Sequence, residues 1–401
     1  MFDRNFRLYL ASRFSSGTAM MMFRAAIAWH VFALSGSAFH LGLIGLVQFA
    51  PSLGLSLVGG AVADSYDRRK VMMLAQLVPF ACGVVLCVAT FRGMTNLQLI
   101  YALIFLVAVA NAFDNPSRAA LLPMLVPRES FPRAVTIAST NQALAFATGP
   151  ALGGFIIASA GIATVYAVYA GGIAGSLFGL ILLRVPPHNG ARRAISLQAV
   201  REGLSFVRRQ QVVLGCMTLD MFAVIFGGAS ALLPIYANEI LGVGARGYGL
   251  LTSSIEVGAL LSSLVLMTLP PIARAGRALL IAVAVYGVAT IVFGLSRWFP
   301  LSLLAYMAVG VADQVSVVMR STAIQLSTPD ELRGRVSSVS FIFIGASNQL
   351  GAVESGFVAA LTSAPFAVVS GGLGCLIVVA VVVAQLPELR RYRISQRMAV
   401  R

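Results

Sequence analysis

The sequence has little charge for its length of 401 residues, and most of that charge is of one sign. Charged residues make up 11% of the chain, whereas an average soluble domain carries roughly 25%. The 14 acidic residues are outnumbered by 29 basic ones. This scarcity of charge excludes a soluble globular protein, and the 58% of hydrophobic residues indicates a membrane protein instead.

Residues that build metal sites or nucleophilic active sites are also rare. The four cysteines lie in apolar stretches without metal-ligand spacing, and we expect small buried side chains: Cys82, Cys87, Cys216 and Cys375. The three histidines are far apart in the sequence: His30, His40 and His188. An enzyme would need a nucleophile–base pair or a metal cluster. The sequence therefore favours a protein that is not an enzyme and that has no metal site.

Long uncharged runs predict the fold. Residues 134–183 carry no charge and are long enough for two membrane helices of about 20 residues each. We predict an all-α membrane protein with twelve transmembrane helices in two six-helix halves. The first six helices cover roughly residues 10–34, 39–63, 70–91, 96–118, 134–158 and 162–183. The second six cover roughly residues 211–238, 246–269, 278–296, 299–322, 336–361 and 366–386.

The distribution of basic residues predicts the orientation. If the N-terminus is cytoplasmic, 25 of the 29 basic residues fall in cytoplasmic segments and three fall in outer loops. The remaining one, Arg24, interrupts the first apolar stretch. Because no small-residue cleavage site follows it, we expect a membrane helix there and not a signal peptide. This bias places both termini in the cytoplasm, so the net charge of +15 reflects orientation and we expect no nucleic-acid partner.

The sequence repeats itself at an offset of 202 residues. Arg118 falls on Arg320 and Gly149 on Gly351, and no gap is needed. Two related halves with the substrate site between them are a common construction of membrane transporters. We divide the chain into an N-terminal half (1–183), a cytoplasmic linker (184–210), a C-terminal half (211–386) and a basic cytoplasmic tail (387–401).

The linker contains one periodic segment. Leu197, Val200, Leu204 and Val207 recur at helical spacing, with arginines on the other positions. This pattern predicts a short amphipathic helix over residues 196–209 that lies on the inner membrane surface. A disordered basic linker is the alternative.

Residues 60–70, between the second and third spans, read GAVADSYDRRK. A glycine, an acid four residues later, a turn and basic residues resemble the loop signature of the major facilitator superfamily. The Asp-Arg-Arg ending is similar to the branch that contains the enterobactin exporter and macrolide efflux proteins. The resemblance rests on Gly60, Asp64, Asp67, Arg68 and Arg69, although Ser65 and Asp67 depart from the general pattern. An ordinary basic loop that only sets the orientation is the alternative.

Asp114 and Arg118 lie four residues apart in the fourth span, so they share a helix face and can form an ion pair. The resemblance implies that they join Asp64 in a conformational latch that closes the inner side and stabilises the outward-facing state. The second-half counterpart of the loop, residues 270–277, keeps basic residues but has no acid, so we expect an asymmetric latch. A purely structural ion pair is the alternative.

The fifth span contains the run GPALGG, residues 149–154. It resembles the antiporter motif of drug–proton exporters, which the family associates with export. Pro150 would kink the helix, and Gly149, Gly153 and Gly154 would allow close packing against a neighbour. An ordinary small-residue packing face is the alternative.

Ionisable residues inside the spans are costly in lipid and tend to face a cavity. The cavity and proton-coupling candidates are Arg24, Asp220, Glu256, Asp313 and Glu354, with Asn141 and Gln349 as polar neighbours. Glu354 falls on Leu152 in the repeat and so breaks it, which is a reason to expect a special role. A carboxyl group removed from water can hold a proton near neutral pH. For Asp220 and Asp313 the alternative is solvation near a helix end.

Together these features predict a secondary active transporter of the major facilitator superfamily in a bacterial inner membrane. The resemblance implies that it exports small amphipathic organic molecules, drug-like or siderophore-like, by alternating access in exchange for protons. We expect a monomer whose energy source is the proton gradient and which needs no cofactor. A proton-coupled importer of a nutrient is one alternative. A membrane enzyme or a sensor that does not transport is another.

Overall fold

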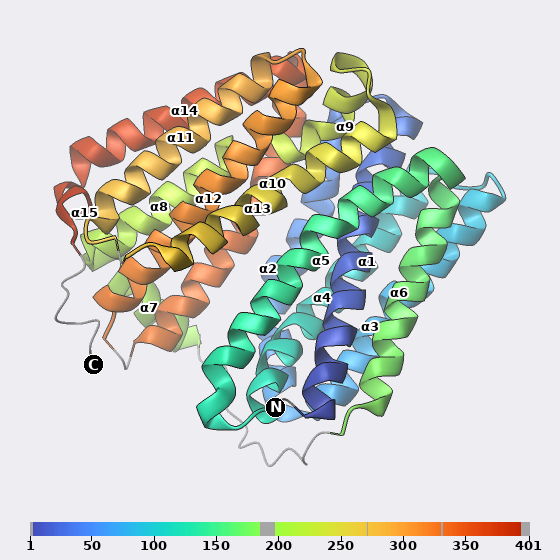
Figure 1. Ribbon diagram of the computed structural model, residues 1–401, viewed down its shortest axis with the longest axis horizontal. Helices are drawn as coiled ribbons and strands as arrows, with labels where there is room; N and C mark the ends of the chain where they lie inside the picture. The colour runs from blue at the N-terminus through green and yellow to red at the C-terminus, as the bar shows by residue number, and fades with distance from the viewer. Residues whose placement is uncertain (1–2, 185–196, 271, 330–331, 394–401) are drawn as a thin grey trace. The chain divides into compact units, whose positions relative to one another are not determined.

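The computed structural model describes residues 3–184, 197–270, 272–329 and 332–393, and these form helices and turns with no strand among them (Figure 1). Eleven helices of this described part are long and apolar enough to cross a membrane. α2 (Ala38–Ser65) occupies the position of the remaining predicted span, and its first part is a shorter apolar helix. The prediction of an all-α membrane protein with twelve spans is confirmed.

The helices of the first half lie close to the predicted spans. Besides α2, they are α1 (Arg4–Ser35), α3 (Arg68–Phe91), α4 (Leu97–Leu121), α5 (Phe131–Ala160) and α6 (Ile162–Leu182). α1 begins earlier than predicted because Asp3 caps it: the Asp3 carboxylate accepts a hydrogen bond of 2.6 Å from the Arg4 backbone N–H. Asn96 caps α4 in the same way, accepting a 2.8 Å bond from the Leu99 N–H.

The second half contains a cytoplasmic helix and the remaining spans. Its long helices are α8 (Gln211–Phe226), α10 (Gly244–Thr268), α11 (Ala275–Leu295), α12 (Phe299–Ser327), α13 (Arg333–Leu361) and α14 (Ala364–Gln385). Between α8 and α10 the chain passes through η3 (Ala229–Leu232), α9 (Leu233–Ile235) and η4 (Tyr236–Ile240).

The predicted seventh span over residues 211–238 is confirmed as Gln211–Ile240, but its helix is interrupted. α8 ends at Phe226, and the chain continues through the pair Gly227–Gly228 into short turns. The hydroxyl of Tyr286 on α11 fills the space beside Gly227, where a Cβ atom would collide with it. That hydroxyl donates a 3.1 Å hydrogen bond to the Gly227 carbonyl, which also accepts a 2.7 Å bond from the Ala229 N–H just beyond the helix end. Side chains inserted at a glycine are a recognised cause of such breaks.

The chain divides into two compact units. Unit 1 comprises Met1–His40, Val47–Ile195 and Gly242–Ser253. Unit 2 comprises Leu41–Leu46, Ser196–Leu241 and Ser254–Arg401. Each unit thus corresponds to one predicted half, apart from a short piece of α2 that belongs to unit 2 and the start of α10 that belongs to unit 1.

Unit 1 is built around α1. This helix packs against α5 and α6, and α3 packs against α4 and α6. At one end of the bundle a buried cluster joins Phe6 and Tyr9 of α1 to Met72 of α3, Leu121 of α4 and Leu180 of α6. These contacts fix four spans against one another.

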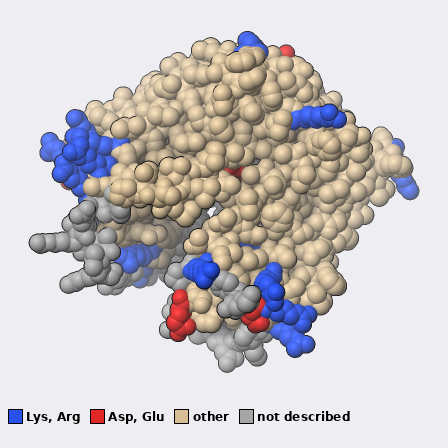
Figure 2. All heavy atoms as spheres, viewed as in Figure 1, with Lys and Arg blue, Asp and Glu red and all other residues tan. Residues whose placement is uncertain are grey.

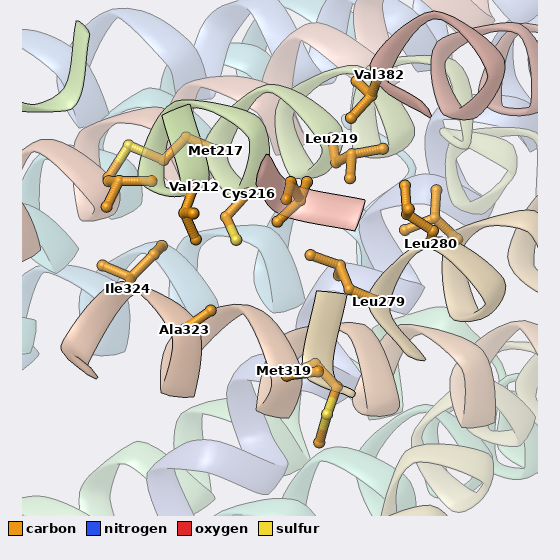
Figure 3. Close-up of a cluster of buried hydrophobic side chains, with 14 of the residues drawn as sticks. Val212, Cys216, Met217, Leu219, Leu279, Leu280, Met319, Ala323, Ile324 and Val382 are labelled. Atoms are coloured by element: carbon orange, nitrogen blue, oxygen red, sulfur yellow. The ribbon is translucent and has the colours of Figure 1, made fainter. Parts of the chain in front are cut away.

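Unit 2 has a larger buried cluster. α11 packs against α12 and α14, and α8 packs against α13 and α14. Cys216 and Leu219 of α8, Leu279 of α11 and Met319 of α12 lie within the cluster (Figure 3). Cys82, Cys216 and Cys375 are buried and free, as predicted, whereas Cys87 is free but only half-buried.

The amphipathic segment of the linker is helical, and its residues Leu204 and Val207 pack against protein. α7 (Leu197–Arg209) packs against α13 and α8. Val207 is 2% exposed and lies in the core cluster of unit 2, with Leu204 packed against that cluster. Arg335 of α13 forms an ion pair with Glu202. The predicted helix is thus present and partly covered by protein, and its placement on the inner membrane surface stays a prediction. Linker residues 185–196 lie outside the described part.

The start of the predicted tail is folded. α15 (Pro387–Arg391) packs against α8, α11 and α14, and Leu389 is fully buried. Residues 394–401 lie outside the described part of the chain.

Candidate functional site

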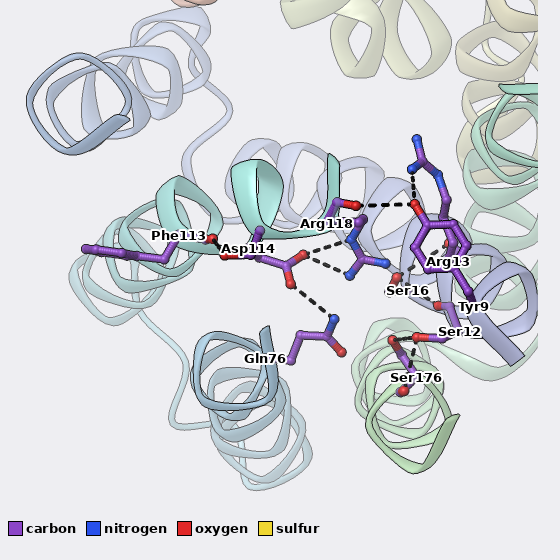
Figure 4. Close-up of polar contacts among 10 residues, drawn as sticks. Tyr9, Ser12, Arg13, Ser16, Gln76, Phe113, Asp114, Arg118 and Ser176 are labelled. Carbon is purple, nitrogen blue, oxygen red and sulfur yellow. Dashed lines mark hydrogen bonds and ion pairs between the residues drawn. The ribbon is translucent and has the colours of Figure 1, made fainter. Parts of the chain in front are cut away.

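A buried polar network crosses unit 1 (Figure 4). Arg118 donates two hydrogen bonds to Asp114 Oδ2, from Nε at 3.2 Å and from Nη2 at 2.8 Å. The two side chains are only 11% and 12% exposed. Gln76 of α3 donates to the other carboxylate oxygen, Asp114 Oδ1, at 3.2 Å. The predicted Asp114–Arg118 pair is confirmed, and a third residue ties it to a neighbouring helix.

The network continues onto α1 and α5. Tyr9 donates its hydroxyl proton to the Arg118 carbonyl at 3.4 Å, and Arg13 Nη1 donates to the Tyr9 hydroxyl at 2.8 Å. A second donor of Arg13 bonds to Gln142 Oε1 on α5. Four spans therefore meet through a network of polar side chains, in which Arg13 Nε and Gln76 Oε1 have no hydrogen-bond partner among the described residues.

Unit 2 holds a second buried ion pair. Arg320 of α12 is paired with Asp220 of α8, and their side chains are 7% and 10% exposed. The pair joins two different helices, unlike the pair in unit 1. Because Asp220 is buried and paired, its interpretation as a solvated residue near a helix end is wrong.

The loop between α2 and α3 anchors two helix ends. Asp67 caps α3 and accepts a 2.9 Å hydrogen bond from the Arg69 N–H. The Arg69 guanidinium donates to the Leu180 carbonyl at 2.7 Å and the Ile181 carbonyl at 2.6 Å, at the end of α6. A cation is favourable at a helix C-terminus. Arg68 contacts the sulfur of Met124 at 3.1 Å.

Asp64, the acid of the predicted latch, has a side chain outside what the structure describes. Its backbone belongs to the last turn of α2, as does that of the half-buried Gly60. The Asp64–Arg118 latch stays a prediction.

The GPALGG run packs closely against α1. A Cβ atom on Gly149 would lie 2.7 Å from the Met21 Cβ and 2.7 Å from the Thr18 carbonyl oxygen. One on Gly153 would lie 3.0 Å from Met22. Pro150 lies inside α5. Small residues let two membrane helices approach at this depth.

Two acids lie at the centres of their helices in unit 2. Asp313 is the middle residue of α12, and Glu256 is the middle residue of the 25-residue α10; both are half-buried. α10 and α12 approach closely beside them, since Cβ atoms on Gly258 and Gly310 would collide with backbone of the facing helix. Both carboxyls therefore belong to the midpoint residue of a helix that is long enough to span a bilayer.

The other candidates are dispersed. Glu354 is half-buried on α13 and accepts a 3.3 Å hydrogen bond from the Ser355 hydroxyl. Arg24 is exposed on α1. Asn141 donates to the Leu10 carbonyl at 3.1 Å and thus ties α5 to α1, while Gln349 is half-buried on α13.

Two members of these networks were missed by the sequence reasoning. Gln76 gave no signal, because a single glutamine in an apolar span has no distinctive pattern. Arg320 did give a signal, because it is the repeat partner of Arg118. Asp220, the only acid in α8, was the candidate partner on that helix.

The model of the family described as transmembrane secretion effector, within the major facilitator superfamily, matches residues 2–399. The chain belongs to this family. Individual members of the superfamily are also similar along the chain. The enterobactin exporter EntS of Escherichia coli O81 (strain ED1a) is 26% identical over 392 residues, which cover 97% of this chain and 93% of EntS. EntS of Escherichia fergusonii has the same identity and coverage.

Solved structures of the superfamily share the fold. A mutant of the nucleoside transporter NupG has a TM-score of 0.75 at 10% identity, covering 95% of this chain and 99% of that one. A bacterial homolog of the human lysosomal transporter Spinster has a TM-score of 0.74 at 16% identity, covering 98% and 100%. This transmembrane secretion effector family member is therefore a multi-pass membrane transporter and not an enzyme.

Proposed function

We propose that the protein exports small amphipathic organic molecules, drug-like or siderophore-like, from the bacterial cytoplasm across the inner membrane. The observation that carries this proposal is the similarity to an enterobactin exporter over 97% of the chain. The GPALGG run supports the direction, because the family resemblance associates this motif with export. Its Gly149 and Gly153 pack closely against α1.

The proposed mechanism is alternating access, in which a six-helix half comprising residues 1–183 rocks against a half comprising residues 211–386. Rigid halves suit this motion, and the buried pairs Asp114–Arg118 and Asp220–Arg320 help to make each unit rigid. Asp64 would close the inner side together with Arg118. The protein would work as a monomer with both termini in the cytoplasm, as the distribution of basic residues indicates.

Proton exchange is assigned to acids that are not held in a buried ion pair with arginine. Asp114 and Asp220 are each paired with arginine, which favours their charged form. Asp313 is the first candidate, because it lies at the centre of α12. Glu354, whose carboxylate is bonded to Ser355, is the second. The energy source would be the proton gradient, without a cofactor.

Export and its substrate class are tested with a deletion strain and a strain that overproduces the protein. Growth is measured across antibiotics and siderophores, and efflux of each compound that separates the strains is then followed directly. We expect the deletion strain to be the more sensitive and to retain more compound. Accumulation of a nutrient by right-side-out vesicles, with no efflux of any compound, would instead establish import.

Coupling is tested in proteoliposomes with an imposed pH gradient. Wild-type protein is expected to drive uphill movement of substrate, and collapse of the gradient is expected to abolish it. Asp313→Asn is expected to keep substrate exchange at equal concentrations while losing uphill movement. Uphill movement without a pH gradient or any other ion gradient would exclude proton coupling.

A further inference from the structure

Exposed arginines gather where α15 packs against the start of α11. This basic patch consists of Arg274, Arg277, Arg390, Arg391 and Arg393. Figure 2 shows lysine and arginine side chains concentrated over the region that Figure 1 labels α15. Glu388 is the one acid in residues 387–393, and residues 272–277 contain none, so the patch is strongly positive.

The fold holds the patch in place. Leu389 is fully buried, and a Cβ atom on Gly215 of α8 would lie 2.9 Å from it. A Cβ atom on Gly276 of α11 would collide with the Leu389 carbonyl. The Gly276 N–H also donates a 3.4 Å hydrogen bond to the Tyr392 carbonyl. Only small residues at positions 215 and 276 permit this contact.

The contact brings the backbone next to three of the arginines together. Arg277 follows Gly276, and Arg391 and Arg393 flank Tyr392, so each is one residue from the hydrogen-bonded pair. Like charges held close together repel one another. An anion bound among them would offset that repulsion, and guanidinium groups match phosphate oxygens in geometry and charge.

A lipid-facing apolar strip begins directly beside the patch. Ile281 lies four residues after Arg277 on the same face of α11, and Val285 and Val288 continue that face. These three side chains are 63%, 47% and 51% exposed. On α14, which packs against α11, Ile377 is also exposed. The surface thus passes from a cationic end to an apolar strip along one membrane helix, which matches a phospholipid and not a soluble polyanion.

We propose that this patch binds an anionic glycerophospholipid, with its phosphate among the arginines and its acyl chains along Ile281, Val285 and Val288. Basic pockets at helix ends are suited to anionic headgroups. The placement in the cytoplasmic leaflet rests on the proposed orientation of the chain. Lipid binding itself depends neither on the orientation nor on the transport direction.

The test is native mass spectrometry of the full-length protein in detergent, titrated with phosphatidylglycerol, cardiolipin or phosphatidylcholine. Wild-type protein is expected to retain both anionic lipids at far lower concentrations than phosphatidylcholine. The triple variant R390Q/R391Q/R393Q is expected to bind them on the order of tenfold more weakly, since each basic residue contributes to the attraction. The double variant R274Q/R277Q is expected to weaken binding as well, which tests the patch from its other side.

A matched control is R4Q/R7Q/R133Q, which removes three exposed arginines of unit 1 and the same charge. This control variant is expected to retain the lipid. Only variants that elute as monodisperse protein on size exclusion are compared. Equal retention of phosphatidylcholine, an equal loss in the control, or complete displacement of the lipid by inorganic phosphate would each overturn the proposal. Because no transport is measured, its failure is distinct from failure of the proposed function.

Discussion

Arg118 and Arg320 occupy equivalent positions in the two halves, yet their charges are neutralised by acids in different places. Arg118 is paired with Asp114, four residues earlier on the same helix. Arg320 is paired with Asp220, which lies on α8. The first pair neutralises a charge within α4 and needs Gln76 to reach another helix, whereas the second joins α8 to α12 directly.

We expect Arg320→Gln to destabilise the protein strongly, because it leaves Asp220 as a buried charge without its partner. Loss of one member of a buried pair costs about 3–5 kcal/mol. The double variant Asp220→Asn, Arg320→Gln is expected to be more stable than the single one. The measurement is the fraction of detergent-solubilised protein that stays monodisperse after heating.

The control for that experiment is the pair between Glu202 and Arg335, whose side chains are 38% and 42% exposed. Arg335→Gln is expected to cost less than about 1 kcal/mol, since exposed ion pairs contribute little. An equal loss of stability in Arg320→Gln and Arg335→Gln would contradict the conclusion that burial makes the Asp220–Arg320 pair the more important one.

Gln76→Leu is expected to lower stability by about 1–3 kcal/mol, because Asp114 Oδ1 loses a buried donor. Gln98→Leu, at an exposed position in the first turn of α4, serves as the comparison and is expected to change little. Thermal unfolding of the two variants is measured in parallel. A larger loss at position 98 would show that the network contributes less than its burial suggests.

Gly149→Ala is expected to reduce both stability and transport, because its methyl group would lie 2.7 Å from Met21 and from the Thr18 carbonyl. Overpacking of this kind costs about 1–3 kcal/mol. Gly171→Ala is the matched control, since nothing lies within 4 Å of the added methyl group. Efflux per molecule of folded protein is compared, and equal effects would exclude close α1–α5 packing as the cause.

Tyr286→Phe is expected to weaken the break in the seventh span by about 1 kcal/mol, because the Gly227 carbonyl loses one of its two donors and keeps only the Ala229 N–H. Tyr66→Phe, at a residue that is 64% exposed, is the control. Hydrogen exchange of residues 224–232 reports the effect locally. Unchanged exchange in the Tyr286 variant would mean that the glycine pair alone sets the break.

The span positions could be predicted because backbone N–H and C=O groups in lipid must form hydrogen bonds within the protein. A run such as residues 134–183 must pair its backbone groups internally, and only helices do so in a single segment. The end of α8 at Phe226 could not be predicted in this way. It depends on the Tyr286 hydroxyl, which comes from a helix about 60 residues away in the chain.

In the candidate site, too, local contacts could be predicted from the sequence and contacts between distant segments could not. Asp114 and Arg118 could be paired from the sequence because a separation of four residues fixes their geometry on a helix. Asp220 and Arg320 are 100 residues apart, so only the packing of α8 and α12 brings them together. The packing of α7 on unit 2 could not be predicted for a related reason. Apolar residues at helical spacing, such as Leu204 and Val207, can be buried against either lipid or protein, and the sequence pattern is the same in both cases.

The unequal partners of Arg118 and Arg320 also record how the two copies diverged after duplication. Ser316 stands where the second copy would carry Asp114, and Thr18 stands where the first would carry Asp220. Ser316 is buried and Thr18 is half-buried, and the Thr18 hydroxyl has no hydrogen-bond partner among the described residues. The arginine occupies the equivalent position in both halves, but the acid that pairs with it lies on the same helix in the first half and on another helix in the second. A chimera made of two first halves would therefore lack Asp220, the carboxylate that joins the seventh span to the tenth. One half can therefore not replace the other.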